Sequence, residues 1–296
     1  MATSTSPAPA QQRPRQNRDS GSGVNFGRVL KSEWIKVTTV PSTVILIVST
    51  VVVMVGLAAL ASWAISITQD EIQSAGAPQG GPGGPGMEGF NAAEQAWMIP
   101  SSGLIFGQLL IASLAVVLIA SEWATGMIRS TMVAVPKRMP ALLAKNVIIA
   151  AIAFVIGAGS AFLSYLVAQP ILGGDLDFGL TTDGVLPSIV NTGTYLALIA
   201  IISMAIGTLL RNTAGGVVTA VALFFVVPLI IVNLLSGLAD WIPDAARFLP
   251  TNAGDQLVAI TTQSDALTQW EGGLVMGAWA LVLLVVSLVV TQKRDV

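Results

Sequence analysis

The sequence contains no cysteine and no histidine, and charged residues make up only 10% of its 296 positions. Without cysteine the chain has no disulfide bonds and no thiolate metal sites. Without histidine it lacks the commonest metal ligand and the side chain that most often transfers protons at neutral pH. These absences exclude a zinc protease and a Ser-His catalytic triad.

Hydrophobic residues, in contrast, make up 53% of the sequence, and the mean hydropathy is +0.77. A soluble domain normally carries about 25% charged residues, so the composition indicates an all-α polytopic membrane protein. Six apolar stretches are long enough to cross a bilayer as helices. They cover residues 44–67, 99–120, 140–172, 191–210, 214–235 and 273–290, within a predicted transmembrane domain over 44–293.

The distribution of charge predicts the orientation of this domain. If both termini are cytoplasmic, 13 of the 14 Lys and Arg residues lie on the cytoplasmic side and only Arg247 lies outside. Twelve of the 16 acidic residues then lie on the outer side. The positive-inside rule therefore predicts six transmembrane helices in the cell (plasma) membrane, with cytoplasmic N- and C-termini.

Polar and small residues inside the predicted spans are interpreted as packing sites. Gln108 and Ser113 are expected to form hydrogen bonds between helices. The sequence also predicts a tight turn at Arg211-Asn212 and a kink at Pro228. Close contact between helices is expected at four glycines, Gly157, Gly159, Gly215 and Gly216.

The N-terminal region divides into two segments. Residues 1–24 are rich in Ser, Pro, Ala and Gln and are predicted to be a disordered cytoplasmic tail. Residues 25–40 place apolar residues on one helical face and basic residues on the other, which predicts an amphipathic connecting helix that contacts membrane lipids. Trp34 is expected at the level of the headgroups. The apolar face is formed by Phe26, Val29, Leu30, Trp34 and Val37, and the residues assigned to the interfacial helix are Phe26, Leu30, Glu33 and Trp34.

Two outer segments also stand out. Residues 68–98 are predicted to form a flexible loop, because a Gly/Pro tract at 76–89 cannot keep a fixed fold. Residues 236–272 are more apolar than a free loop. Short re-entrant helices before the last span are predicted there, around Trp241–Pro243 and Phe248–Pro250.

A charged segment at 121–145 separates the second and third spans. A Lys or Arg at the bilayer centre costs about 2.5–3.5 kcal/mol, so this segment is predicted to be a cytoplasmic loop. We expect a short helix over 125–134 that ends before Pro136, and we expect Lys145 to reach back to the membrane interface. The charged residues of the segment are Glu122, Arg129, Lys137, Arg138 and Lys145.

The chain shows no energy source of its own. No span carries an ionisable residue in its interior, which argues against a proton relay. Sodium coupling through backbone carbonyls at broken helices is left open. The sequence has no G-x-x-x-x-G-K-[ST] motif for nucleotide binding. A transport function would therefore need a partner that docks on the cytoplasmic loop 121–145.

Three stretches resemble the membrane subunit of ABC-2-type transporters, exporters with six spans per subunit and a separate ATPase. They are FGRVLKSEWIKV, EWATGMIRSTMVAVPKRMPALLAK and RFLPTNAGDQL, and the likeness extends over 25–294. The resemblance implies that the first stretch is a connecting helix and that the second is the coupling helix that docks on the ATPase. It implies a pair of re-entrant helices in the third. The Gly/Pro tract at 76–89 does not belong to this pattern.

The resemblance further implies a permease subunit that is not an enzyme and uses no cofactor or metal. Such a subunit forms a homodimer, or a heterodimer with a second permease, and binds a separate ABC ATPase. It moves a hydrophobic or amphipathic substrate (drug, peptide or lipid-like) outward by alternating access, and no nucleic-acid partner is expected. The residues implied for ATPase coupling are Glu122, Trp123, Thr125, Gly126, Met127, Ile128, Arg129, Pro136 and Arg138.

The sequence leaves two other functions open: a non-transporting immunity or sensing membrane subunit, and an ATP-independent carrier.

The sequence also leaves a simpler role open for the charged loop 121–145. On this reading, Glu122 does no more than begin a helix, where the helix dipole favours a carboxylate by about 0.3–1 kcal/mol. On the same simpler reading, Arg129, Lys137 and Arg138 do no more than fix the topology or hold lipid phosphates.

Overall fold

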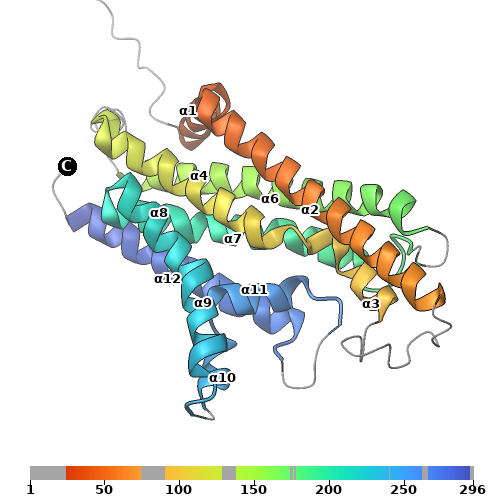
Figure 1. Ribbon diagram of the computed structural model, residues 1–296. Helices are drawn as coiled ribbons and strands as arrows, with labels where there is room; N and C mark the ends of the chain where they lie inside the picture. The colour runs from red at the N-terminus through yellow and green to blue at the C-terminus, as the bar shows by residue number, and fades with distance from the viewer. Residues whose placement is uncertain are drawn as a thin grey trace, which may run out of the picture.

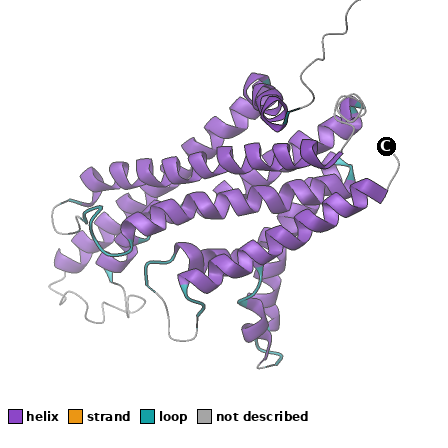
Figure 2. Cartoon of the chain, turned by 180° about the vertical axis from the view of Figure 1, so that it is seen from behind, coloured by secondary structure: helices purple, strands orange, loops and turns teal. Residues whose placement is uncertain are grey.

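The computed structural model describes residues 25–74, 91–128, 138–173, 176, 178–239, 241–261 and 266–293. Across these ranges the chain is helical and contains no strand (Figure 2). The predicted tail 1–24, the Gly/Pro tract 76–89, and Arg129 and Pro136 of the charged loop lie outside the described residues. Their predicted roles stay predictions.

The helices follow one another along the chain without any long described loop. In chain order they are α1 (Phe26–Thr39), α2 (Pro41–Ser74), α3 (Ala92–Trp97), the 3-10 turn η1 (Ile99–Ser101), α4 (Leu104–Ala124), α6 (Arg138–Leu172), α7 (Val185–Leu210), α8 (Thr213–Val221), the π-helical η2 (Ala222–Val226), α9 (Val227–Ile230), the π-helical η3 (Ile231–Leu235), α10 (Trp241–Ala246), α11 (Pro250–Val258) and α12 (Gln269–Lys293).

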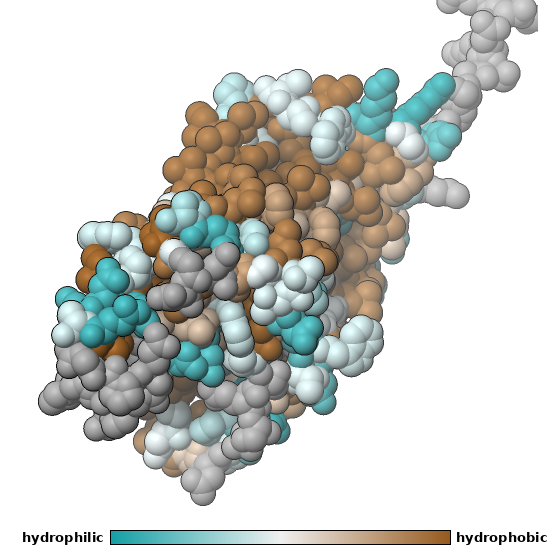
Figure 3. Space-filling view, turned by 90° about the vertical axis from the view of Figure 1, so that its right-hand side faces the viewer, coloured by the Kyte–Doolittle hydropathy of each residue, from teal (hydrophilic) through white to brown (hydrophobic). Residues whose placement is uncertain are grey.

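Among the described residues, six helical stretches are long and apolar enough to cross a membrane. They coincide with the six predicted spans and confirm the all-α architecture. A hydrophobic surface lies between hydrophilic groups that gather toward the two ends of the molecule (Figure 3). Two boundaries differ from the prediction: α2 continues to Ser74, into the predicted outer loop, and α7 begins at Val185. Both helices continue beyond the apolar run, because a helix need not end where its hydrophobic surface ends.

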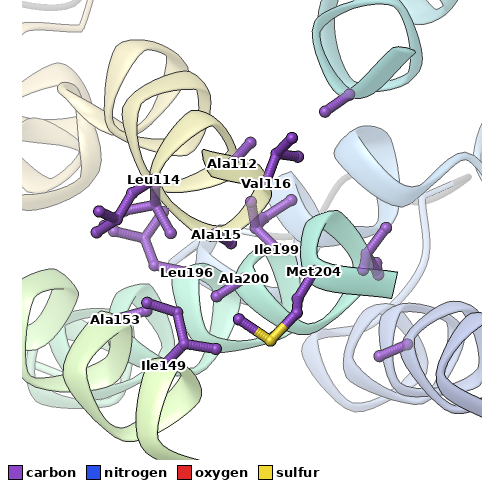
Figure 4. Packing of buried hydrophobic residues seen from close by; sticks show 14 of the residues in the cluster. Ala112, Leu114, Ala115, Val116, Ile149, Ala153, Leu196, Ile199, Ala200 and Met204 are labelled. Carbon is purple, nitrogen blue, oxygen red and sulfur yellow. The ribbon is translucent and has the colours of Figure 1, made fainter. Parts of the chain in front are cut away.

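Helix α7 lies at the centre of the bundle and contacts α4, α6, α8, α11 and α12 (Figure 1). Its side chains are buried on nearly every face, as expected for a helix surrounded by other helices. Figure 4 shows Leu196, Ile199 and Met204 of α7 between residues of α4 and α6. Leu114 of α4 and Ile149 of α6 contribute to the same fully buried core.

Glycine allows α6 and α7 to approach closely. A Cβ atom at Gly157 would lie 2.8 Å from the carbonyl oxygen of Thr192, and one at Gly193 would lie 2.7 Å from that of Phe154. Small residues of this kind let the backbones of membrane helices make contact. The packing roles predicted for two of the four glycines are confirmed, those of Gly157 and Gly216. At Gly159 an added Cβ would meet nothing within 4 Å, and at Gly215 it would make only an ordinary contact.

Of the two polar residues predicted to bond between helices, one does so. The hydroxyl of Tyr195 on α7 donates a hydrogen bond to Oε1 of Gln108 on α4. Ser113 instead donates to the carbonyl of Leu109 on its own helix, at 2.8 Å. The prediction for Ser113 was wrong because a serine hydroxyl in a helix can bond the carbonyl four residues earlier.

The fifth span begins at the predicted tight turn. Arg211 takes a left-handed conformation with φ 52°, and Asn212 caps α8 by accepting a hydrogen bond from the Gly215 amide at 2.8 Å. Farther along, Pro228 has no N–H to donate to the carbonyl of Phe224, four residues earlier. The hydroxyl of Thr251 on α11 donates to that carbonyl at 2.8 Å. In Figure 1, α9 and α10 extend away from the bundle, and α11 lies beside them.

The first predicted short helix is α10, which begins at Trp241. The second was predicted around Phe248–Pro250, but Phe248 and Leu249 form a turn and α11 begins only at Pro250. Helix α11 is fixed to α7 by two hydrogen bonds to its last carbonyls. Ser188 donates to Val258 at 2.7 Å, and Asn191 donates to Leu257 at 2.9 Å. The insertion of α10 and α11 into the membrane from the outer side stays a prediction.

Candidate functional site: four charges at one end of the bundle

Helix α1 carries a carboxylate in the middle of its buried face. Its first turn is capped by Asn25, whose side chain accepts a hydrogen bond from the Gly27 amide at 3.2 Å. The buried residues Val29, Glu33 and Val37 recur every four positions and therefore line one face. Glu33 thus faces the protein.

The predicted apolar face of α1 is divided in the structure. Val29 and Val37 are buried and Leu30 is half-buried, whereas Phe26 and Trp34 are 43% and 49% exposed. The face that packs on the protein is therefore centred on Glu33. Phe26 and Trp34 lie to the side of it, at the surface.

Glu33 and three other residues form a closed ring of ion pairs, which we call the charge ring: Glu33 and Lys36 of α1, Glu122 of α4 and Lys145 of α6. Nζ of Lys145 donates to Glu33 and, at 2.8 Å, to Glu122. Nζ of Lys36 donates to Glu33 at 2.8 Å and to Glu122 at 3.3 Å. Each lysine therefore contacts both carboxylates, and the formal charges cancel.

Burial makes this pairing necessary. Glu33 is 1% exposed, and Glu122 and Lys145 are 6% exposed each. An unpaired charge at such a depth would cost several kcal/mol. Burial raises the pKa of the Glu33 carboxyl, but Lys145 and Lys36 outweigh it and hold that pKa below its usual value. Burial lowers the pKa of Lys36, yet the two carboxylates outweigh it and raise that pKa. Both shifts favour the charged forms at neutral pH.

The end of α4 is also tied to the turn between α7 and α8. The guanidinium carbon of Arg211 lies 3.9 Å from the ring centroid of Trp123, a cation–π contact. Trp123 follows Glu122 directly, so adjacent residues of α4 contact α1 and α6 on one side and the α7–α8 turn on the other. The second oxygen of Glu122, Oε2, is buried without a hydrogen-bond partner among the described residues.

The predicted coupling residues fall into three groups. Glu122 and Ile128 are buried, and Trp123 is half-buried. Thr125, Gly126 and Met127 follow α4 and are exposed. Thr125 and Gly126 form a turn, where Gly126 has φ +72°, and the chain is helical again at Met127. Arg129 and Pro136 lie outside the described residues, and Arg138 begins α6.

Two lysines of the charge ring were not identified as site residues from the sequence. Lys145 was predicted to reach the membrane interface, and Lys36 was placed on the polar face of α1. In the structure both side chains pair with Glu33 and Glu122, because two buried carboxylates need cationic partners. The position of Lys145 relative to the membrane interface stays a prediction. One signal in the sequence could have revealed this site. At 100° per residue, Glu33 lies between Val29 and Val37 on the apolar face of the helix, and a carboxylate at such a position needs a cationic partner.

Comparison with known proteins adds no assignment. No protein-family model matches the chain, and a search of the curated proteins finds no match. The described residues also hold no group of three Asp, Glu, His or Cys side chains placed to bind a metal ion. The functional argument therefore rests on the charge ring and its surroundings.

Proposed function

We propose that this chain is the membrane subunit of an ATP-driven exporter of the ABC-2 type. A separate ATPase docks at the cytoplasmic end of α4, and a dimer of permease subunits moves a hydrophobic or amphipathic substrate outward by alternating access. The observation that carries the proposal is the charge ring, which joins α1, α4 and α6 at the end of the bundle where the lysines and arginines concentrate.

The charge ring suits the transmission of force. The exposed turn Thr125–Met127 directly follows α4 and offers a contact surface beside the ring. A displacement of this turn would move α4 directly, and the ring would pass it to α1 and α6. The contact of Trp123 with Arg211 would carry it to the α7–α8 turn. A partner that binds two states of this end differently can therefore shift several helices together.

The energy source is assigned to a partner because the chain offers none. In the described spans Asp, Glu, Lys and Arg lie only toward the ends and form no chain of carboxylates through the interior that could relay protons. The 296 residues contain no G-x-x-x-x-G-K-[ST] motif for phosphate binding. ATP hydrolysis by a docked partner is the source that a ring of charges beside an exposed turn at one end of the bundle favours.

The test is purification of the tagged chain from its native membranes in mild detergent. We expect a vanadate-sensitive ATPase to copurify, and we expect ATP to drive uptake of a hydrophobic dye into inside-out vesicles. Met127→Glu places a charge on the exposed turn and should weaken copurification. Thr39→Glu, which adds the same charge at an exposed position of α1, is the matched control and should not.

Each alternative function gives a different result. Dye uptake that needs no ATP and ignores vanadate would identify an ATP-independent carrier. A bound ATPase without transport of any dye would identify a sensing or immunity subunit. Normal ATPase binding by Met127→Glu would show that this turn is not the docking surface.

A further inference from the structure

A hollow of about 260 Å³ lies between the fifth span and α11, with the start of α4 as its floor. Apolar side chains form most of its wall, among them Ile105 of α4 and Phe224, Phe225 and Pro228 of the fifth span. A second hollow of about 390 Å³ adjoins it and shares Asp255 as a lining residue. Together they offer the size and the apolar lining of a site for a drug-sized ligand.

The hollow lies far from the charge ring. Gln108 lines it, and Glu122 of the ring lies fourteen residues later on the same helix. At 1.5 Å per residue, the two positions are roughly 20 Å apart along α4. In the predicted topology this places the hollow in the outer half of the membrane domain.

Helix α11 turns one carboxylate into the hollow, that of Asp255. An adjacent face of α11, about 100° around the helix from Asp255, packs on α7, because Gly254 lies so close to the ring of Tyr195 that a Cβ atom there would overlap it. Leu257 and Val258 are buried on the same side. Thr251, Asn252 and Asp255 are spaced three and four residues apart on the other face and line the hollow.

Asp255 has no partner for its charge among the described residues. It forms no ion pair and no side-chain hydrogen bond there. Arg247, which lines the second hollow, lies 3.8 Å from Asp244 instead. Asp255 is exposed where it lines the two hollows, and the protein beside it removes enough water from the carboxylate to raise the pKa of Asp255 to about 6. The group is therefore mostly ionised at neutral pH and unpaired.

We propose that this hollow binds an organic monocation with apolar substituents, with Asp255 paired to the cationic centre and the fifth span in contact with the apolar groups. The inference rests on the proposed export function and names its substrate class. An anion would meet the unpaired carboxylate, and a neutral apolar molecule would leave it without a partner. A cation satisfies both the charge and the apolar wall.

The test uses two ions of nearly identical shape and opposite charge. Tetraphenylphosphonium and tetraphenylborate should be measured for binding to the full chain in nanodiscs of zwitterionic lipid, without ATP or ATPase. We expect saturable binding of the cation. Asp255→Asn should weaken it at least about tenfold, because the substitution removes the negative charge that attracts the cation. Asp255→Glu should retain it.

The controls separate this site from adsorption to lipid. Glu94→Gln removes an exposed carboxylate from α3 and should leave binding unchanged. Tetraphenylborate should bind wild-type protein no better than empty nanodiscs. Equal cation binding by the wild type and Asp255→Asn, or saturable binding of the anion by the wild type, would overturn the proposal.

Acidification provides an independent readout. Binding of the cation should weaken as the pH falls through about 6, because Asp255 takes up a proton and the probe does not titrate. The other ionisable groups around Asp255 are Tyr195 of α7 and Arg247, and tyrosine and arginine side chains ordinarily titrate far above this range. Asp255→Asn should show no such step. Because no ATPase is present, failure of this binding test would leave the export proposal standing, and failure of ATP-driven uptake would leave the binding site standing.

Discussion

Glu33 of α1 and Lys145 of α6 stand 112 positions apart in the sequence and form a buried ion pair. The pair fixes α1 to the bundle by more than apolar contact. Because Glu122 and Lys36 close the ring, loss of a single member leaves an excess charge in a buried place. Such a loss typically costs about 3–5 kcal/mol, whereas the intact pair adds little to stability over apolar residues.

Lys145→Met should therefore destabilise the protein strongly, by about 3 kcal/mol, because it leaves two carboxylates beside a single lysine. The measurement is the free energy of unfolding in detergent, or the midpoint of thermal unfolding. Lys31→Met removes an exposed lysine from α1 and is the matched control, with an expected change within about 0.5 kcal/mol. Equal stabilities of the two variants would show that the ring does not hold the helices together.

The stability of the protein should also depend on pH through Glu33. Its pKa is lower in the folded protein than its ordinary value of 4.5, so folding favours the ionised form. The stabilisation is fully present above pH 4.5 and is lost as the pH falls through the lower, folded value. The stability difference between wild type and Glu33→Gln should therefore be constant between pH 5 and 7 and shrink below 4.5. A difference that stays constant down to pH 3 would contradict this.

Two glycines of α6 provide a matched pair for helix packing. Gly157→Ala places a Cβ atom 2.8 Å from the Thr192 carbonyl of α7, so it should destabilise the protein by about 1–3 kcal/mol. Gly159→Ala meets nothing and should be neutral or stabilising by up to about 1 kcal/mol, since alanine favours a helix over glycine. Thermal unfolding of the purified variants measures both effects. A larger loss of stability for Gly159→Ala than for Gly157→Ala would refute the close contact of α6 with α7.

Topology can be tested because the chain has no cysteine of its own. Single cysteines at the exposed positions Ser74 and Thr181 should react with an impermeant maleimide on intact cells. Cysteines at Thr125 and Gln292, which are also exposed, should react only after lysis. Cysteines at Ser188 and Thr291 would not report on topology, because both positions are buried and closed to the maleimide. Labelling of Thr125 from outside would reverse the proposed orientation.

The sequence predicted the spans because long apolar runs reflect the bilayer itself rather than any one contact. It predicted the turn at Arg211-Asn212 and the short helices α10 and α11 because local residue chemistry decides them. The charge ring could not be predicted in the same way. Its four members come from three helices, and their attraction appears only once α1 is placed across the ends of α4 and α6.

The orientation of the Asp255 side chain could not be predicted from the sequence either. Its sequence neighbours suggest a short surface helix, and nothing local shows which face is buried. Only the contact of Gly254 with Tyr195, fifty-nine positions earlier, turns the carboxylate toward the fifth span. A single sequence does not reveal a contact between residues so far apart along the chain.

The neutrality of the charge ring has a consequence for energy coupling. A unit charge that crosses the bilayer field exchanges about 2.3 kcal/mol per 100 mV with it. The ring carries two positive and two negative charges, so its own displacement moves no net charge through the field. Voltage then acts on this end of the bundle only through charges outside the ring, such as Arg28 and Lys31 of α1. In the proposed exporter the ring can therefore pass on a movement that the bound ATPase starts, without adding a voltage-dependent cost of its own.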